Sequence, residues 1–324
     1  MLHILHHAFF KCLLFYAAGA VYRMTHSIDL EVLGGLIKKM PQTSFFFLVG
    51  ALAISALPPL NGFASEFLLY NGLFSADVPS AVAKGALVVG AALLAFVGAL
   101  SAFAMTRAFG VAFLGSRRDA SVECSGEAPF SLRFSMAVHG IVIVVIGLFP
   151  GLGLMLVNEP VRLFFSAHGL ELEAESALGS VRGLMASVSV MNVGLVLCVV
   201  AAVLLRWALL SSSNRKHVTW GCGYTAANSR MQYTGSSFSD PLLTLFRSIL
   251  TRHTREKLPS GPFPEAGYFN THYVDAVERR LFRFLGRGEN FVERLMKHVN
   301  EEPRFAFGAG LLFLVVMGLV VGMR

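Results

Sequence analysis

Long apolar runs recur along the chain, and they constrain its fold more than any other feature. A bilayer core about 30 Å thick needs about 20 helical residues to cross it, and several runs reach that length. Of the 324 residues 55% are hydrophobic and 15% are charged, whereas a soluble domain has roughly 25% charged residues. The sequence therefore predicts an all-α, polytopic integral membrane protein.

Six of these runs are expected to cross the membrane. They cover residues 2–22, 42–71, 82–107, 132–157, 184–210 and 304–323. Lys and Arg are concentrated in the connections after the first, third and fifth runs, whereas the other two connections contain few. By the positive-inside rule, the connections rich in Lys and Arg are expected on the cytoplasmic side.

The predicted domain organisation has three parts. Residues 1–210 form a transmembrane bundle of five helices, residues 211–303 form a cytoplasmic basic segment, and residues 304–324 form a final transmembrane helix. Within the basic segment, residues 272–299 place apolar side chains at roughly helical spacing among arginines. This pattern predicts a basic amphipathic helix that lies on a membrane surface or against a partner. A solvated helix packed on its own loop is an equal alternative.

The second run contains a helix break. Pro58 and Pro59 remove two successive backbone donors, and Gly62 follows them closely, so the helix is expected to stop and restart here. Broken backbone at membrane depth is tolerated where protein or a water-lined cavity satisfies its polar groups. The break therefore indicates an ion pathway, with an ordinary proline kink as the alternative.

Ionisable residues occur within the first two runs. His3, His7 and Lys11 follow each other at four-residue spacing, which places them in one row along a helix face, and Glu66 follows the break. A charged side chain at mid-bilayer costs at least about 2.5–3.5 kcal/mol, so this set indicates a proton pathway. The alternative is a structural polar network, with His3 and His6 at the membrane interface and Lys11 reaching it by snorkelling.

His139 and the four cysteines are the remaining groups to consider. His139 lies inside the fourth run, where a histidine either relays protons or hydrogen-bonds a neighbouring helix. The four cysteines are far apart, and two of them lie inside apolar runs, so neither a disulfide framework nor a metal site is indicated. No cofactor-binding motif is present, and we expect no redox cofactor, no catalytic residue and no nucleic-acid partner.

Several motifs resemble those of a known family. The strings are H-I-L-H-H-A-F-F-K-C-L-L-F at 3–15, D-L-E-V-L-G-G-L-I-K-K-M-P at 29–41 and A-L-P-P-L-N-G-F-A-S-E-F at 56–67. Together they resemble the antiporter-like proton-translocating subunits of respiratory complex I and of Mrp cation/proton antiporters. W-G-C-G-Y at 220–224 and M-Q-Y-T-G-S-S-F at 231–238 look most like the large membrane subunit of hydrogenase-4 and formate hydrogenlyase.

The resemblance implies roles for individual residues. The family's row of two histidines and a lysine matches His3, His7 and Lys11, which would belong to a central hydrophilic axis. Its broken helix ends in a lysine or glutamate that exchanges protons with the far side of the membrane, and Glu66 occupies that place. Lys11 would be the central carrier, the two histidines its relay and Glu66 the exit group.

Family members also have many more crossings, built from two inverted helix repeats, and this chain resembles only their C-terminal part. We therefore expect either a fragment or separately encoded half of such a subunit, or a truncated product without transport activity. The leading hypothesis is the C-terminal part of a proton-translocating subunit in a membrane-bound hydrogenase or an NADH:quinone oxidoreductase-like complex. Such a chain is not catalytic alone.

The resemblance also implies partners, a transported ion and a location, and two alternative functions remain. The expected partners are the other membrane subunits of the assembly, the transported ion is the proton or sodium, and the location is a bacterial or archaeal cytoplasmic membrane. One alternative is an Mrp-type cation/proton antiporter subunit. The other is a non-conducting scaffold subunit whose polar groups only fix helix packing.

Overall fold

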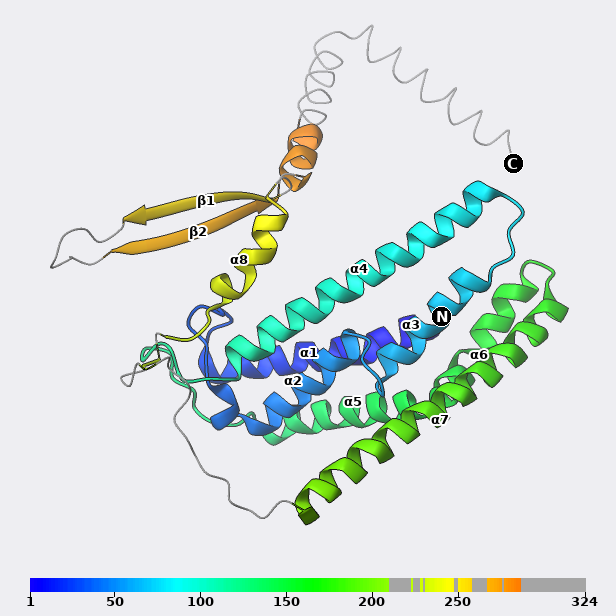
Figure 1. Ribbon diagram of the computed structural model, residues 1–324, viewed down its shortest axis with the longest axis horizontal. Helices are drawn as coiled ribbons and strands as arrows, with labels where there is room; N and C mark the ends of the chain where they lie inside the picture. The colour runs from blue at the N-terminus through cyan, green and yellow to red at the C-terminus, as the bar shows by residue number, and fades with distance from the viewer. Residues whose placement is uncertain are drawn as a thin grey trace, which may run out of the picture. The chain divides into compact units, whose positions relative to one another are not determined.

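A computed structural model describes residues 1–209, 223, 228–229, 231–247, 250–257, 267–275 and 277–286. The helices are α1 (Leu2–Thr25), η1 (Leu36–Lys38), α2 (Pro41–Ile54), α3 (Asn61–Ser75), α4 (Ala81–Ala112), α5 (Phe130–Leu148), α6 (Pro150–Ser166), α7 (Glu171–Leu209) and α8 (Gly235–Leu245), and the strands are β1 (Leu250–Lys257) and β2 (Tyr268–Asp275) (Figure 1). The described residues form two compact units that divide between Phe238 and Ser239.

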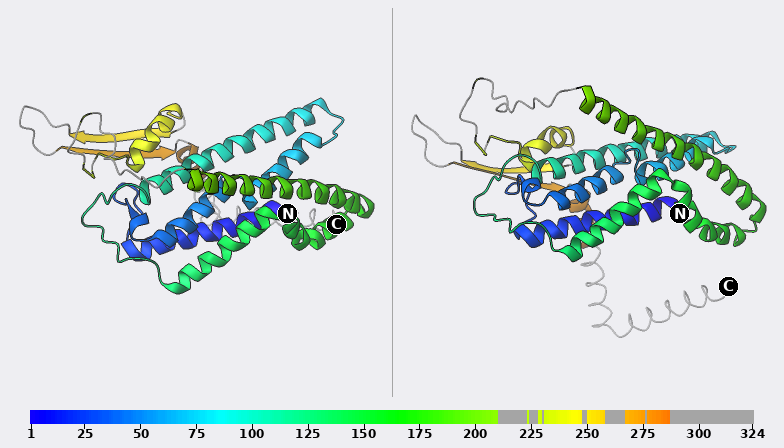
Figure 2. Two further views of the ribbon diagram at one scale, coloured as in Figure 1. Left: turned by 60° about the horizontal axis from the view of Figure 1, so that its bottom comes forward. Right: turned by 90° about the horizontal axis from the view of Figure 1, so that it is seen from below.

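The helices of the first unit run back and forth between its two ends. The connections α1–α2 and α4–α5 lie at one end, and the connections α3–α4 and α6–α7 lie at the other, as both figures show (Figures 1 and 2). The Lys- and Arg-rich connections 26–40 and 113–129 therefore share one end of the unit. This alternation is the arrangement that successive membrane crossings require.

Within the described residues, four helices are long and apolar enough to cross a membrane. They are α1, α4, α5 and residues Glu175–Leu209 of α7. At about 1.5 Å per residue, the 39 residues of α7 extend about 58 Å, well beyond the bilayer core of about 30 Å. The expected helical, multi-pass membrane fold is confirmed for the first unit. The expected final span at 304–323 lies outside the described residues.

The second span is interrupted where the prolines predict it. Helix α2 ends at Ile54 and α3 begins at Asn61, and the peptide bond between Pro58 and Pro59 is cis. The fourth expected span is also divided, because α5 ends at Leu148 and α6 begins at Pro150. Proline suits the first position of a helix, where its missing N–H has no intrahelical partner.

Helix α1 is at the centre of the first unit. It packs against α2, α3, α5 and α6. Its fully buried side chains include Leu13, Ala17 and Ala20. They join a cluster with Met40, which directly precedes α2, and with Ala53 and Ile143 of neighbouring helices. The buried positions recur every three or four residues along α1, as expected for one face of a helix.

The motif at 231–238 anchors the chain to the end of the bundle that carries the basic connections. The Gln232 side chain accepts a hydrogen bond from the Ser116 amide at 3.0 Å and donates to the Ser116 carbonyl at 2.8 Å. The Glu31 carboxylate accepts from the Ser236 hydroxyl at 2.8 Å. Gly115 contributes by lacking a side chain, since a Cβ there would crowd the side-chain oxygen Oε1 of Gln232.

Arg118 completes this anchor. Its guanidinium donates to the carbonyl oxygens of Leu30 at 3.0 Å and of Tyr233 at 2.5 Å. Burial lowers the pKa of Arg118, and the carboxylate of Glu31 acts in the opposite direction. The motif that distinguishes one subgroup of the resembled family thus has a structural role here, because it binds the connections 26–40 and 113–129 together.

The second unit contains an antiparallel hairpin that the sequence analysis did not expect. Strand β1 pairs with β2 from Leu250 opposite Asp275 to Lys257 opposite Tyr268. Residues 272–275 of the expected amphipathic helix therefore belong to a strand, and a helix covers 277–286. The sequence Y-F-N-T-H-Y-V-D of β2 is rich in aromatic and β-branched residues, which favour strands. Residues 287–299 lie outside the described residues.

The break in the second span gives a packing prediction. A Cβ at Gly62 would lie 1.8 Å from the Ala53 carbonyl oxygen, whereas a Cβ at Gly72 on the same helix has nothing within 4 Å. We expect Gly62→Ala to lower stability by at least about 1–3 kcal/mol, because backbone must move. The thermal stability of the detergent-solubilised protein measures this. Gly72→Ala is the matched control, and equal melting of the two variants would contradict the packing described.

The anchor gives a second prediction. Gln232→Ala removes hydrogen bonds that contribute about 0.5–1.5 kcal/mol each. We expect amide hydrogen exchange at Ser116 to accelerate about tenfold, the change that roughly 1.4 kcal/mol produces. Met231→Ala alters an exposed neighbour and should leave exchange unchanged. Equal exchange in both variants would show that the motif does not hold the connection.

Candidate functional site

The predicted row of ionisable residues lies on α1, but its members differ in exposure. His3 and Lys11 are half-buried and His7 is exposed. The ring centroids of His3 and His7 are 6.1 Å apart, and His7 lies edge-on to Phe10 at 5.2 Å. Lys11 makes no hydrogen bond or ion pair with another residue in the described part of the chain. The row exists as a geometric feature, without direct hydrogen bonds between its members.

His3 connects this row to the broken helix. Its Nδ1 lies 3.0 Å from the hydroxyl of Ser65 on α3, and that hydroxyl lies 3.1 Å from the Gly62 carbonyl oxygen. A hydroxyl has a single proton to donate, whereas a carbonyl oxygen only accepts. When Nδ1 carries a proton, it donates a hydrogen bond to the hydroxyl, and the hydroxyl donates one to the Gly62 carbonyl oxygen. When Nδ1 does not, the hydroxyl can donate to His3. The contact can therefore exist in two protonation arrangements.

Glu66 directly follows Ser65 but does not join this contact. It is half-buried, and its Oε2 lies 3.8 Å from the position of a Cβ on Gly98 of α4. The ion pairs among the described residues do not include Glu66 or Lys11. The structure thus brings His3 next to the residue that precedes Glu66. It does not bring Lys11 and Glu66 into direct contact.

His6 is the functional candidate that the sequence reasoning missed. It was expected at the membrane interface under the structural alternative, but its side chain is fully buried. Its Nδ1 donates to the Asn61 carbonyl oxygen at 2.7 Å, and the Asn61 side-chain amide donates to the His6 carbonyl oxygen at 3.3 Å. The signal was present in the sequence, since Leu2, His6 and Phe10 are spaced like one buried helix face.

The two helix breaks meet beside this pair. A Cβ on Gly147, near the end of α5, would lie 2.6 Å from the Pro59 carbonyl oxygen and 2.7 Å from the Asn61 amide nitrogen. From α7, the fully buried Asn192 donates a hydrogen bond to the Gly147 carbonyl oxygen at 2.8 Å. We call this contact between residues 59–61 and Gly147, with the side chains of His6 and Asn192, the break junction.

His139 is on α5, and its ring faces aromatic residues of α1. Its Nδ1 lies 2.8 Å from the carbonyl oxygen of Ser135 in its own helix. Its ring is 5.2 Å from that of Tyr16 and 6.0 Å from that of Phe9, centroid to centroid. In the described part of the chain, no hydrogen bond joins His139 to His3, His7 or Lys11.

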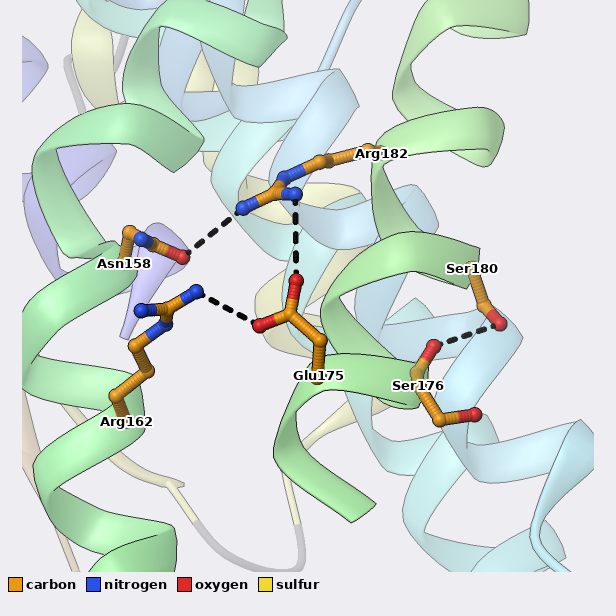
Figure 3. Close-up of polar contacts among 6 residues, drawn as sticks. All are labelled: Asn158, Arg162, Glu175, Ser176, Ser180 and Arg182. Carbon is orange, nitrogen blue, oxygen red and sulfur yellow. Dashed lines mark hydrogen bonds and ion pairs between the residues drawn. The ribbon is translucent and has the colours of Figure 1, made fainter. Parts of the chain in front are cut away.

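A separate polar network holds α6 against α7 near their connection. Figure 3 shows Glu175 between two arginines: Arg162 lies 2.7 Å from one carboxylate oxygen and Arg182 lies 3.9 Å from the other. Arg182 also donates to Asn158 at 3.3 Å. These side chains are about half exposed, and such pairs contribute about 0–1 kcal/mol each. The network fits a role in fastening the helix hairpin.

Comparisons with known proteins agree with this architecture. Residues 1–109 match the family model described as NADH:quinone oxidoreductase/Mrp antiporter, transmembrane. An uncharacterized protein of Mycobacterium tuberculosis is 34% identical over 98% of this chain and 52% of its own length. Formate hydrogenlyase subunit 3 of Escherichia coli is 34% identical over 76% of this chain and 39% of its own length. This chain therefore spans about half or less of the curated relatives it matches.

A solved structure shows the same fold. A chain of the membrane-bound sulfane sulfur reductase, an archaeal respiratory membrane complex, superposes with a TM-score of 0.59 at 20% identity, covering 98% of this chain and 46% of that one. The motifs, the broken second span and the matched relatives all indicate one family. The chain belongs to the antiporter-like membrane subunits of the NADH:quinone oxidoreductase and Mrp antiporter family, with relatives in formate hydrogenlyase and hydrogenase-4.

Proposed function

We propose that this chain is the C-terminal part of a proton-translocating subunit in a membrane-bound hydrogenase of the hydrogenase-4 or formate hydrogenlyase type. The same role applies if the complex is of the NADH:quinone oxidoreductase-like type. The protons move through His3, His7, Lys11 and Glu66. The observation that carries the proposal is the contact between His3 and Ser65, which joins the row on α1 to the broken helix one residue before Glu66.

The energetics of Lys11 and Glu66 support this role. Each is half-buried in a helix of the membrane bundle, and neither makes an ion pair within the described part of the chain. A charged group within a membrane span costs at least about 2.5–3.5 kcal/mol unless it is hydrated or paired. Ionisable residues that persist at this cost are candidates for an ion or proton pathway.

Electron transfer and proton translocation take place in different subunits of such a complex. Electron transfer takes place elsewhere in the assembly, and its energy reaches this subunit through the electrostatic coupling of neighbouring ionisable groups. The partners are other membrane subunits, as expected from the similarity to formate hydrogenlyase subunit 3. The location is a bacterial or archaeal cytoplasmic membrane. His139 is kept as an additional pathway candidate.

The family match also favours a second candidate function. The matching family model includes Mrp antiporters as well as NADH:quinone oxidoreductases. A subunit that exchanges sodium for protons would use the same buried groups. Dependence of proton movement on sodium in vesicles distinguishes this function from sodium-independent pumping.

Glu66→Gln tests the exit group. The substitution keeps the shape of the side chain and removes its titration, so we expect proton translocation to fall at least tenfold while electron transfer continues. A pH-sensitive fluorescent dye in inverted vesicles that contain the whole complex measures translocation. Glu159→Gln, an exposed carboxylate on α6, is the matched control. Unchanged translocation in Glu66→Gln would remove this residue from the mechanism.

Lys11→Gln distinguishes a proton-conducting subunit from a scaffold subunit. If Lys11 carries protons, the variant assembles in normal yield and loses translocation, because a neutral amide cannot take up a proton. If the polar groups only fix helix packing, the yield of assembled complex falls instead, and the remaining complex pumps at the normal rate per molecule. Yield is measured by the amount of complex purified from membranes, and flux by the same dye assay.

A further inference from the structure

The break junction contains a surplus of hydrogen-bond acceptors. The carbonyl oxygen of Asn61 can only accept, so His6 Nδ1, which lies 2.7 Å from it, carries the proton. In the neutral ring the other nitrogen, Nε2, is then an acceptor. The Nδ2 groups of Asn61 and Asn192 both donate to backbone carbonyls, which leaves each Oδ1 as an acceptor.

These three atoms are buried and lack donors. His6 Nε2, Asn61 Oδ1 and Asn192 Oδ1 have no hydrogen-bond partner among the described residues. All three side chains are fully buried. Leaving a buried acceptor without a donor is unfavourable, and native proteins satisfy such groups with ordered water when protein donors are absent.

Glycines border this junction. A Cβ on Gly153 of α6 would lie 3.0 Å from His6 Nε2, so a glycine here keeps a side chain away from this nitrogen. A Cβ on Gly147 would lie 2.6 Å from the Pro59 carbonyl oxygen, so α5 approaches residues 59–61 closely through a glycine. No side chain of these two residues therefore stands against the unpartnered acceptors.

We propose that the break junction binds water, and that His6 takes up a proton from this water at Nε2. In the transfer, an O–H bond of the protonated water breaks and an N–H bond forms at Nε2, which leaves neutral water and an imidazolium. The reverse step returns the proton, because Nδ1 stays bonded to the Asn61 carbonyl. This transfer rests on the proton-translocating function proposed above, whereas the water site itself does not.

A density map of the intact complex tests the water site directly. We expect an ordered water within about 2.7–3.2 Å of His6 Nε2, the range for hydrogen bonds. Dry packing against Nε2 would overturn the site. A sodium ion bound by the two Asn oxygens would overturn it as well, and would favour the antiporter function instead.

A glycine pair tests whether the open space matters. Gly153→Ala places a methyl group in front of Nε2, whereas Gly151→Ala on the same helix meets nothing within 4 Å. We expect Gly153→Ala to displace the water and to lower proton translocation at least tenfold, and Gly151→Ala to leave both unchanged. Equal translocation in the two variants would overturn the role of the water in transport.

His6→Gln tests the proton acceptor while keeping the hydrogen bonds. Glutamine can donate to the Asn61 carbonyl and present an acceptor to the water, but it does not take up a proton at neutral pH. We expect normal assembly, retained water density and at least tenfold slower translocation. Wild-type translocation would overturn the role of His6. If Glu66→Gln and Lys11→Gln pump normally while the water is present, the proposed function fails and the site stands.

Discussion

The first unit depends on satisfying the backbone where its second membrane span is broken. A broken helix in an apolar environment leaves carbonyl and amide groups that lipid cannot bind, so protein must supply partners. Where α3 restarts after the break, His6 of α1 and Asn61 exchange hydrogen bonds, from side chain to carbonyl in both directions. Because His6 is on the central helix α1, the same interaction fixes the position of α3, and with it Ser65 and Glu66.

Much of the fold follows from local sequence. Apolar run length predicted the spans in the described residues, and Pro58 and Pro59 predicted the interruption between α2 and α3. These features are local, since proline restricts its own backbone and that of its neighbour. The β1–β2 hairpin was not predicted, because the apolar residues of Y-F-N-T-H-Y-V-D do not alternate strictly with polar ones, as a half-buried strand would require.

The site was less predictable than the fold, and the reason is its tertiary origin. The spacing of His3, His7 and Lys11 indicated a row, and the row is present on α1. Spacing could not tell which of the adjacent His6 and His7 is buried, because that depends on which helices cover α1. Asn192 carried no signal, as an amide in an apolar run is ordinary until the Gly147 carbonyl of another helix meets it.

The balance of donors and acceptors separates a structural polar network from a conducting one. A network that only fixes packing is most favourable when every buried group is paired within the protein, since each unpaired group weakens it. The ion pairs and hydrogen bonds between α6 and α7 have this closed character. The break junction differs, because three buried acceptors there have no hydrogen-bond partner among the described residues. Such acceptors need donors, and water is the donor that the proposed site supplies.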